Sequence, residues 1–188
     1  MPRKFMFTRD EILSAALDLA RERGITAVTA RNIGKKLGSS SKPIFSFFEN
    51  MGDVLSAVME AVGELYQNYL KEDMTSGKYP PYKASGMAYI RFAKEEKELF
   101  KMLFMRDRSH ESIDSKEEIK QLLELIQGNL GINEEEARLF HLEMWIYVHG
   151  MATMAATSYL ALEEDFISKV LTDGYEGLKI RYTGGKSL

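Results

Sequence analysis

The chain of 188 residues contains no cysteine, only four prolines and a single tryptophan. Without cysteine it has no disulfide, no thiolate nucleophile and no thiolate metal ligand. A Gly-rich phosphate loop and a Gly-x-Ser-x-Gly nucleophile elbow are also missing from the sequence. We therefore expect a protein that is not an enzyme and that needs no cofactor.

The N-terminal stretch MPRKFMFTRDE lacks the apolar core of a secretory signal. Its basic residues are soon followed by acidic ones. The absence of cysteine is compatible with a reducing compartment. We therefore expect the protein to be cytoplasmic.

Long hydrophobic runs are scarce, and the main exception is the stretch 144–162, nineteen residues without a formal charge. Its length approaches that of a transmembrane helix. However, Tyr147, His149 and Thr153 interrupt the run, and acidic residues flank it on both sides. We therefore expect a helix that continues to about Leu162 and is buried nearly all round in protein, with no membrane partner.

The formal net charge of −3 hides an uneven distribution along the chain. Residues 1–50 hold nine Lys or Arg and five Asp or Glu, a net charge of +4. The remaining residues hold 16 basic and 23 acidic side chains, a net charge of −7. A basic end on an acidic body favours a protein that meets a polyanion at one end only.

Apolar residues recur at helical spacing along most of the chain, and no segment alternates as a strand would. The pattern predicts helices over residues 9–23, 53–71, 82–106 in two segments, 119–130, 133–162 and 164–181. The predicted fold class is all-α. We expect a three-helix head at residues 1–52 and a larger helical domain at residues 53–188.

The stretch TARNIGKKLGSSSKPIFSFFEN, residues 29–50, predicts two short helices around a tight turn. Thr29 can cap the first helix, and Gly38 can end it in the left-handed conformation. Pro43 is tolerated because it falls in the first turn of the second helix. This is the layout of a helix-turn-helix, whose second helix enters the DNA major groove.

Several side chains of this stretch are polar, basic or aromatic and are expected to face outward. We predict that they contact double-stranded DNA, with Arg31 and Lys35 on phosphates. A basic arm of Arg3, Lys4 and Arg9 is an additional candidate for phosphate contacts. The predicted DNA-binding residues are Thr29, Arg31, Lys35, Ser40, Ser41, Lys42, Phe45, Ser46 and Asn50.

The segments Leu37-Gly38-Ser39-Ser40 and Ile44-Phe45-Ser46-Phe47-Phe48-Glu49-Asn50 resemble the motif of the TetR family of transcriptional repressors. The resemblance covers roughly residues 8–60 and implies an operator-binding homodimer. Two positions depart from the family pattern. Pro43 replaces a common Thr, and Met51 replaces a Lys that often touches phosphate. Trp145, His149 and Gly150 resemble a short motif in the C-terminal domain of some TetR relatives.

The body is rich in methionine and aromatic residues, which are typical of a core and also of an adaptable pocket. We predict that an apolar or aromatic small-molecule effector binds there and lowers the affinity for DNA. The predicted ligand-binding residues are Tyr89, Phe92, Phe104, Met144, Trp145 and His149. An all-helical carrier of lipid-like molecules, without regulatory DNA binding, is the alternative function.

His141 and His149 lie eight residues apart on one helical stripe, whereas His110 falls in a loop. The spacing supplies no further metal ligands, so we expect packed, hydrogen-bonded core histidines and no metal site.

The last two predicted helices, 144–162 and 164–181, are both apolar and contain small residues. We expect them to pair with a second copy in a four-helix bundle, giving a homodimer.

Overall fold

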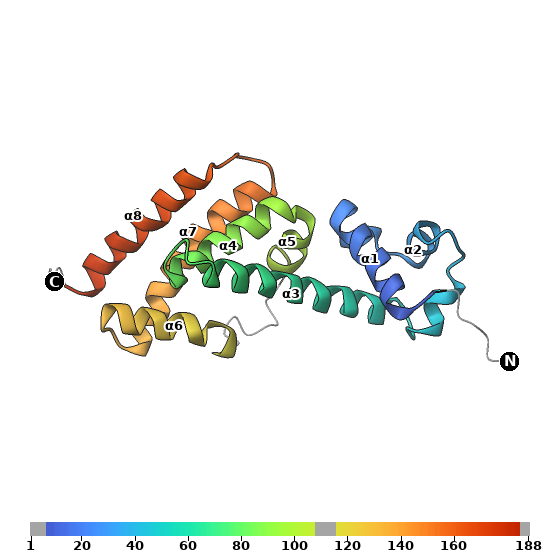
Figure 1. Cartoon of the computed structure of the whole chain (residues 1–188), viewed down its shortest axis with the longest axis horizontal. Helices are drawn as coiled ribbons and strands as arrows, with labels where there is room; N and C mark the ends of the chain where they lie inside the picture. Colours follow the sequence, from blue (N-terminus) through green and yellow to red (C-terminus); the bar gives the residue numbers. More distant parts are fainter. Residues whose placement is uncertain (1–6, 108–115, 185–188) are drawn as a thin grey trace. The chain divides into compact units, whose positions relative to one another are not determined.

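The computed structural model describes residues 7–107 and 116–184, and all regular structure in these ranges is helical (Figure 1). The predicted all-α fold class is confirmed. The α-helices are α1 Arg9–Arg23, α2 Ala30–Lys36, α3 Met51–Thr75, α4 Pro81–Glu95, α5 Lys97–Phe104, α6 Lys116–Leu130, α7 Glu134–Ala156 and α8 Glu164–Tyr182. Two 3₁₀ helices, η1 Ile25–Ala27 and η2 Lys42–Ser46, lie between α1 and α3. Of the residues singled out in the sequence, Arg3, Lys4 and His110 lie outside the described ranges.

The chain forms two compact units. Unit 1 comprises Met1–Gln67 and Glu96–Arg106, and unit 2 comprises Asn68–Glu95 and Asp107–Leu188. The α3 helix therefore contributes residues to both units, and the chain passes between units at the α4–α5 corner. The division into functional domains after residue 52 stays a prediction.

Unit 1 has a small core of aliphatic side chains from its consecutive helices. Thr8 starts α1 with a capping box, in which its hydroxyl accepts from the Glu11 N–H and the Glu11 carboxylate accepts from the Thr8 N–H. Ile12 of α1, Ile33 of α2 and Val58 of α3 are completely buried. This core holds α2 and η2 against α1 and α3.

The short helix α5 belongs to unit 1, although it lies far along the chain from the other helices of this unit. Arg21 Nε of α1 donates to Glu96 Oε2 at 2.7 Å, and the Glu96 side chain is only 12% exposed. Leu99 is completely buried, and the Phe104 ring meets the Tyr66 ring at 5.0 Å. Local sequence patterns do not predict this association, because it depends on contacts about 75 residues apart.

Unit 2 is built on the packing of α4 along α7, with α6 and α8 beside them. The side chains of Phe92, Ile126, Phe140 and Ile167, one from each of α4, α6, α7 and α8, are almost completely buried. Asn133 caps the start of α7, because its side chain accepts from the Glu136 N–H at 3.0 Å within a capping box.

The prediction that α7 continues to Leu162 is wrong. The helix ends at Ala156, since Ser158 adopts a left-handed conformation with φ of 56°. The Tyr159 N–H then bonds back to the Met154 carbonyl at 2.9 Å, closing the end of the helix. The Tyr159 side chain is 82% exposed. The uncharged run is therefore a helix followed by a turn.

The prediction that this helix is buried nearly all round is also wrong for the single chain. Ile146 is 60% exposed, and Leu139, Leu142 and Tyr147 are exposed too. One face of α7 packs in the core of unit 2 while another meets solvent. None of the helices in the described residues is both long enough and apolar enough to span a bilayer.

Candidate functional site

The first helix of the predicted helix-turn-helix begins as its sequence predicts. The Thr29 hydroxyl accepts from the Asn32 N–H at 3.2 Å, and the Asn32 amide donates to the Ala27 carbonyl at 2.9 Å. The first bond satisfies a backbone N–H at the start of α2, and the second connects α2 to the preceding segment. With Ile33 buried below, Arg31 and Lys35 are exposed on the outer side of α2.

The turn after α2 is a Schellman motif. The Ser39 N–H donates to the Gly34 carbonyl at 2.8 Å, and the Gly38 N–H donates to the Lys35 carbonyl at 3.1 Å. Gly38 has φ of +67°, a conformation that costs glycine least because it has no Cβ. A Cβ on Gly34 would lie 2.9 Å from the Ser40 carbonyl group, so the backbone passes over Gly34 as closely as glycine allows.

The predicted second helix is the 3₁₀ helix η2. Pro43, in its first turn, has no N–H to donate, and the five residues are too few for a stable α-helix. Ile44 and Phe48 are buried beneath η2, and the Arg9 guanidinium stacks over the Phe48 ring at 5.0 Å. This packing fixes which side of η2 faces outward.

The predicted DNA-binding residues gather on the outer side of α2, the turn and η2. The Phe45 ring is 47% exposed although it is apolar, and Ser41 is half-buried. The remaining seven are exposed: Thr29, Arg31, Lys35, Ser40, Lys42, Ser46 and Asn50. Their role in DNA binding stays a prediction at this point. We call Arg31, Lys35, Lys42, Phe45 and Ser46 the outer face of unit 1.

Two members of the predicted set serve as helix caps. Thr29 caps α2, and Asn50 Oδ1 accepts from the Asp53 N–H at 3.2 Å at the start of α3. The Asp53 carboxylate in turn accepts from the Glu49 N–H at 3.0 Å. These two side chains therefore position the helices on either side of η2.

The basic side chains of unit 1 fall into two groups. Lys36 donates to Glu22 at 2.8 Å and lies 3.4 Å from Asp18, and the hydrogen bond to Glu22 raises its pKa. Within the described residues, no carboxylate forms an ion pair with Arg31, Lys35 or Lys42. The outer face of unit 1 is therefore electropositive, as a phosphate-binding surface must be.

The predicted ligand-binding residues lie in different surroundings. Tyr89, Trp145 and His149 meet in unit 2: Tyr89 Oη lies 2.9 Å from His149 Nδ1, and the Trp145 and His149 rings stack at 4.6 Å. Phe92 and Met144 are buried in the core of unit 2, whereas Phe104 belongs to unit 1. Burial lowers the pKa of His149, so its imidazole is neutral at pH 7.

The two helical histidines are packed and hydrogen-bonded, as predicted. His141 Nδ1 lies 3.1 Å from Tyr82 Oη, a second Tyr–His pair between α4 and α7. Burial raises the pKa of Tyr82, which keeps its hydroxyl protonated and able to donate. In the part of the chain that the structure describes, no three His, Asp or Glu side chains cluster as a metal site requires.

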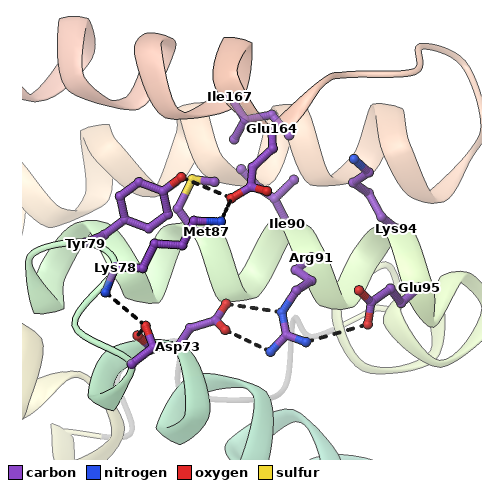
Figure 2. Close-up of a pocket in the computed structure, with 11 residues that line it drawn as sticks. Asp73, Lys78, Tyr79, Met87, Ile90, Arg91, Lys94, Glu95, Glu164 and Ile167 are labelled. Atoms are coloured by element: carbon purple, nitrogen blue, oxygen red, sulfur yellow. Dashed lines mark hydrogen bonds and ion pairs between the residues drawn. The ribbon is translucent and has the colours of Figure 1, made fainter.

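Two cavities are lined by residues that the sequence analysis did not identify. One, of about 240 Å³, lies in unit 2 among the end of α3, α4 and the start of α8 (Figure 2). The other, of about 310 Å³, lies in unit 1 and includes Met59, Met102 and Met105 among its lining residues. No sequence motif marks either cavity, because each combines charged helix ends from separate parts of the chain.

We expect Gly34→Ala to destabilise the protein by about 1–3 kcal/mol, because the added Cβ must push the Ser40 backbone away. Urea unfolding followed by circular dichroism measures the change. Gly63→Ala is the matched control, since Gly63 is a helical glycine with open space around its Cβ position. The control should gain up to about 1 kcal/mol from helix propensity. Equal gains in both variants would contradict the packing described for the turn.

Two family models match the chain, one to each half of the architecture. The model described as "Bacterial regulatory proteins, tetR family" matches residues 12–58, which include α2, the turn and η2. The model described as "Tetracyclin repressor-like, C-terminal domain" matches residues 82–172. A search of curated proteins finds no match.

Solved structures share the fold at low sequence identity. A TetR-like transcriptional regulator from Rhodococcus sp. RHA1 is 18% identical with a TM-score of 0.66, over 94% of this chain and 96% of that one. A second transcriptional regulator from Rhodococcus is 18% identical with a TM-score of 0.61, over 93% and 97%. SmeT, the repressor of the Stenotrophomonas maltophilia multidrug efflux pump SmeDEF, is 18% identical with a TM-score of 0.55, over 95% and 91%.

The two family models together span the helix-turn-helix and most of unit 2, and the structural neighbours share the helical fold over nearly the whole chain. Members of this family are generally DNA-binding proteins rather than enzymes. The chain belongs to the TetR family of bacterial transcriptional regulators.

Proposed function

We propose that the protein is a cytoplasmic, homodimeric repressor that binds a pseudo-palindromic operator and leaves it when a small apolar or aromatic molecule binds to unit 2. The observation that carries the proposal is the outer face of unit 1, where three exposed cations and the exposed Phe45 ring lie on elements whose opposite side is buried in the core. Neither a catalytic step nor a cofactor is part of it. The alternative, a lipid carrier without DNA binding, would leave this electropositive surface without a role.

The outer face of unit 1 combines residues of η2, expected at the major groove and its edge, with residues of α2, expected at the phosphate backbone. Lys42 and Phe45 are exposed on η2. We expect this element to enter the major groove, as the second helix of a helix-turn-helix does. The Phe45 ring has no hydroxyl for a phosphate, so it packs on sugar or on a thymine methyl group. Arg31 and Lys35 on α2 supply charge for phosphates and set the position of the head on the duplex.

We expect Lys42→Ala to weaken operator binding and to reduce the salt dependence of log K by about one unit, because one phosphate loses its counter-charge. Fluorescence anisotropy with labelled operator at several salt concentrations measures both quantities. Lys120→Ala, which removes the same charge from an exposed site on α6, should change neither. Unchanged affinity and slope in a Lys42→Ala, Phe45→Ala double variant would disprove the assignment.

The dimer surface is proposed from the apolar side chains that one chain leaves exposed on α7 and α8. Leu139, Leu142 and Ile146 follow one another at helical spacing on α7, and Phe166 and Ile180 are exposed on α8. A monomer rarely exposes so many large apolar groups on adjoining helices. Two such helices from each of two copies form a four-helix bundle, the usual symmetric solution.

Introducing a charge into this surface tests the dimer. Ile146 is largely exposed, so Ile146→Glu should leave the single chain folded but place two buried, uncompensated charges in the dimer. Sedimentation velocity at micromolar concentration should show a dimer for the unmodified protein and a monomer for the variant. Gln121→Glu, an equal charge on the exposed side of α6, should remain dimeric. A monomeric unmodified protein would refute the proposed assembly.

The proposed effector site is centred on Tyr89, Trp145 and His149. The Trp145 ring is 38% exposed and stacks on an imidazole, so an apolar ligand could extend the stack. Phe92 and Met144 supply buried apolar surface in the same unit, while Phe104 stays a prediction from the other unit. A ligand regulates only if it prefers the state that does not bind DNA.

The only tryptophan of the chain reports on this site. A ligand that quenches Trp145 fluorescence should weaken operator binding by roughly 5- to 150-fold, and operator DNA should weaken the ligand by the same factor. Fluorescence titrations with and without DNA measure both sides of the linkage. Trp145→Phe should abolish the optical signal but keep the effect on DNA. Ligand binding at Trp145 that leaves operator affinity unchanged would contradict the proposed control.

A further inference from the structure

The cavity of unit 2 shown in Figure 2 combines an apolar floor with charged walls. Met87 and Ile90 of α4 and Ile167 of α8 are buried and form the apolar part of its lining. Its volume, about 240 Å³, lies below the roughly 300–1,000 Å³ of pockets that take drug-sized ligands. An occupant would therefore be small, with a short apolar part.

One wall of the cavity has more carboxylates than cations. Arg91 Nη2 lies 2.9 Å from Asp73 Oδ1 and 2.8 Å from Glu72 Oε2, and Arg91 Nη1 lies 3.7 Å from Glu95 Oε2. The guanidinium also stacks over the Tyr69 ring at 4.3 Å, which holds it in place. Of these carboxylates, Asp73 and Glu95 line the cavity, and two carboxylates beside one cation leave this wall with an excess of negative charge.

Another wall has more cations than carboxylates. Lys78 forms an ion pair with Glu164, and the Tyr79 hydroxyl donates to the same carboxylate at 3.0 Å. Lys94 Nζ donates to the backbone carbonyl of Leu162 at 2.9 Å, a partner that carries no formal charge. Two ammonium groups beside one carboxylate leave an excess of positive charge. In Figure 2, Asp73, Arg91 and Glu95 lie along one side of the cavity, and Lys94 and Glu164 lie on the other.

From this arrangement we propose that the cavity binds a zwitterionic amino acid with a short apolar side chain. Its carboxylate faces Lys94 and Lys78, its ammonium group faces Glu95 and Asp73, and its side chain packs on the apolar floor. A ligand of a single charge would meet like charge at one of the two walls, and an uncharged ligand would leave the excess charge of each wall unbalanced. The zwitterion complements both walls at once.

This site is separate from the aromatic effector site proposed above, because none of its lining residues belongs to that set. Amino-acid binding at this site does not depend on the proposed repressor function, but a role for the amino acid in regulation does. Operator binding is therefore measured in parallel on the same preparation, so that failure of the amino-acid site can be told apart from failure of the proposed function. If the operator binds and amino acids do not, only the present inference fails.

Isothermal titration calorimetry of the full chain with charge-deleted analogues tests the ligand class. L-leucine, L-valine or L-methionine at millimolar concentration should give saturable heat. N-acetyl-L-leucine, which lacks the ammonium charge, and L-leucinamide, which lacks the carboxylate, should each bind at least about tenfold more weakly than L-leucine. Absence of saturable heat with all three amino acids overturns the proposal, as does equal binding of the analogues.

Two single substitutions test which wall holds the carboxylate of the ligand and which holds its ammonium group. Lys94→Gln should weaken L-leucine about tenfold and remove its advantage over L-leucinamide, because the carboxylate loses its counter-charge. Glu95→Gln should remove the preference for L-leucine over N-acetyl-L-leucine, because the ammonium group loses its counter-charge. The glutamine amide oxygen still accepts from the Tyr69 hydroxyl, so the local packing is kept. Lys120→Gln, on the exposed side of α6, should bind as the unmodified chain does. The assignment is overturned if either wall variant, folded as judged by a native circular dichroism melt, binds L-leucine as tightly as the unmodified chain and still prefers it over the analogue.

Discussion

The close passage of the Ser39–Ser40 backbone over Gly34 is the constraint on which the outer face of unit 1 depends. It lets the Schellman motif close α2 within two residues, so η2 starts immediately after the turn. Ile33 and Ile44 then share one core, and burial of Ile44 forces Lys42 and Phe45 outward. A larger residue at position 34 would change the angle between α2 and η2 and thereby the surface offered to DNA.

The α4–α5 corner joins unit 2 to unit 1 through two adjacent residues. Glu95 lines the charged cavity of unit 2 and accepts from the Tyr69 hydroxyl at 2.7 Å. Glu96, the next residue, accepts from Arg21 of α1 in unit 1. The covalent chain therefore passes directly from a wall of the cavity in unit 2 to a side chain held by α1 of unit 1. The continuous helix α3 is a second connection, because its residues belong to both units.

Local features of the fold were predictable from sequence, whereas features set by distant partners were not. The caps at Thr29 and Asn133 and the end of α2 at Gly38 follow from side-chain and backbone chemistry within a few residues. Sequence patterns do not predict the early end of α7, because the uncharged run contains no residue that typically ends a helix and serine rarely adopts the positive φ seen at Ser158. The place of α5 in unit 1 depends on Arg21, and the charged cavity depends on three separated segments. Sequence patterns do not predict the exposed side of α7 either, since apolar periodicity does not distinguish a face packed in the core from an apolar face left exposed by the single chain.

Hydroxyl-radical footprinting on the DNA beside the protein's own gene tests the central claim most directly, namely that a dimer presents two copies of the outer face of unit 1 to successive major grooves. The account predicts two protected patches on one side of the duplex, roughly 34 Å or about one helical turn apart and related by a pseudo-two-fold axis. A single patch, or uniform protection that does not depend on sequence, would contradict it.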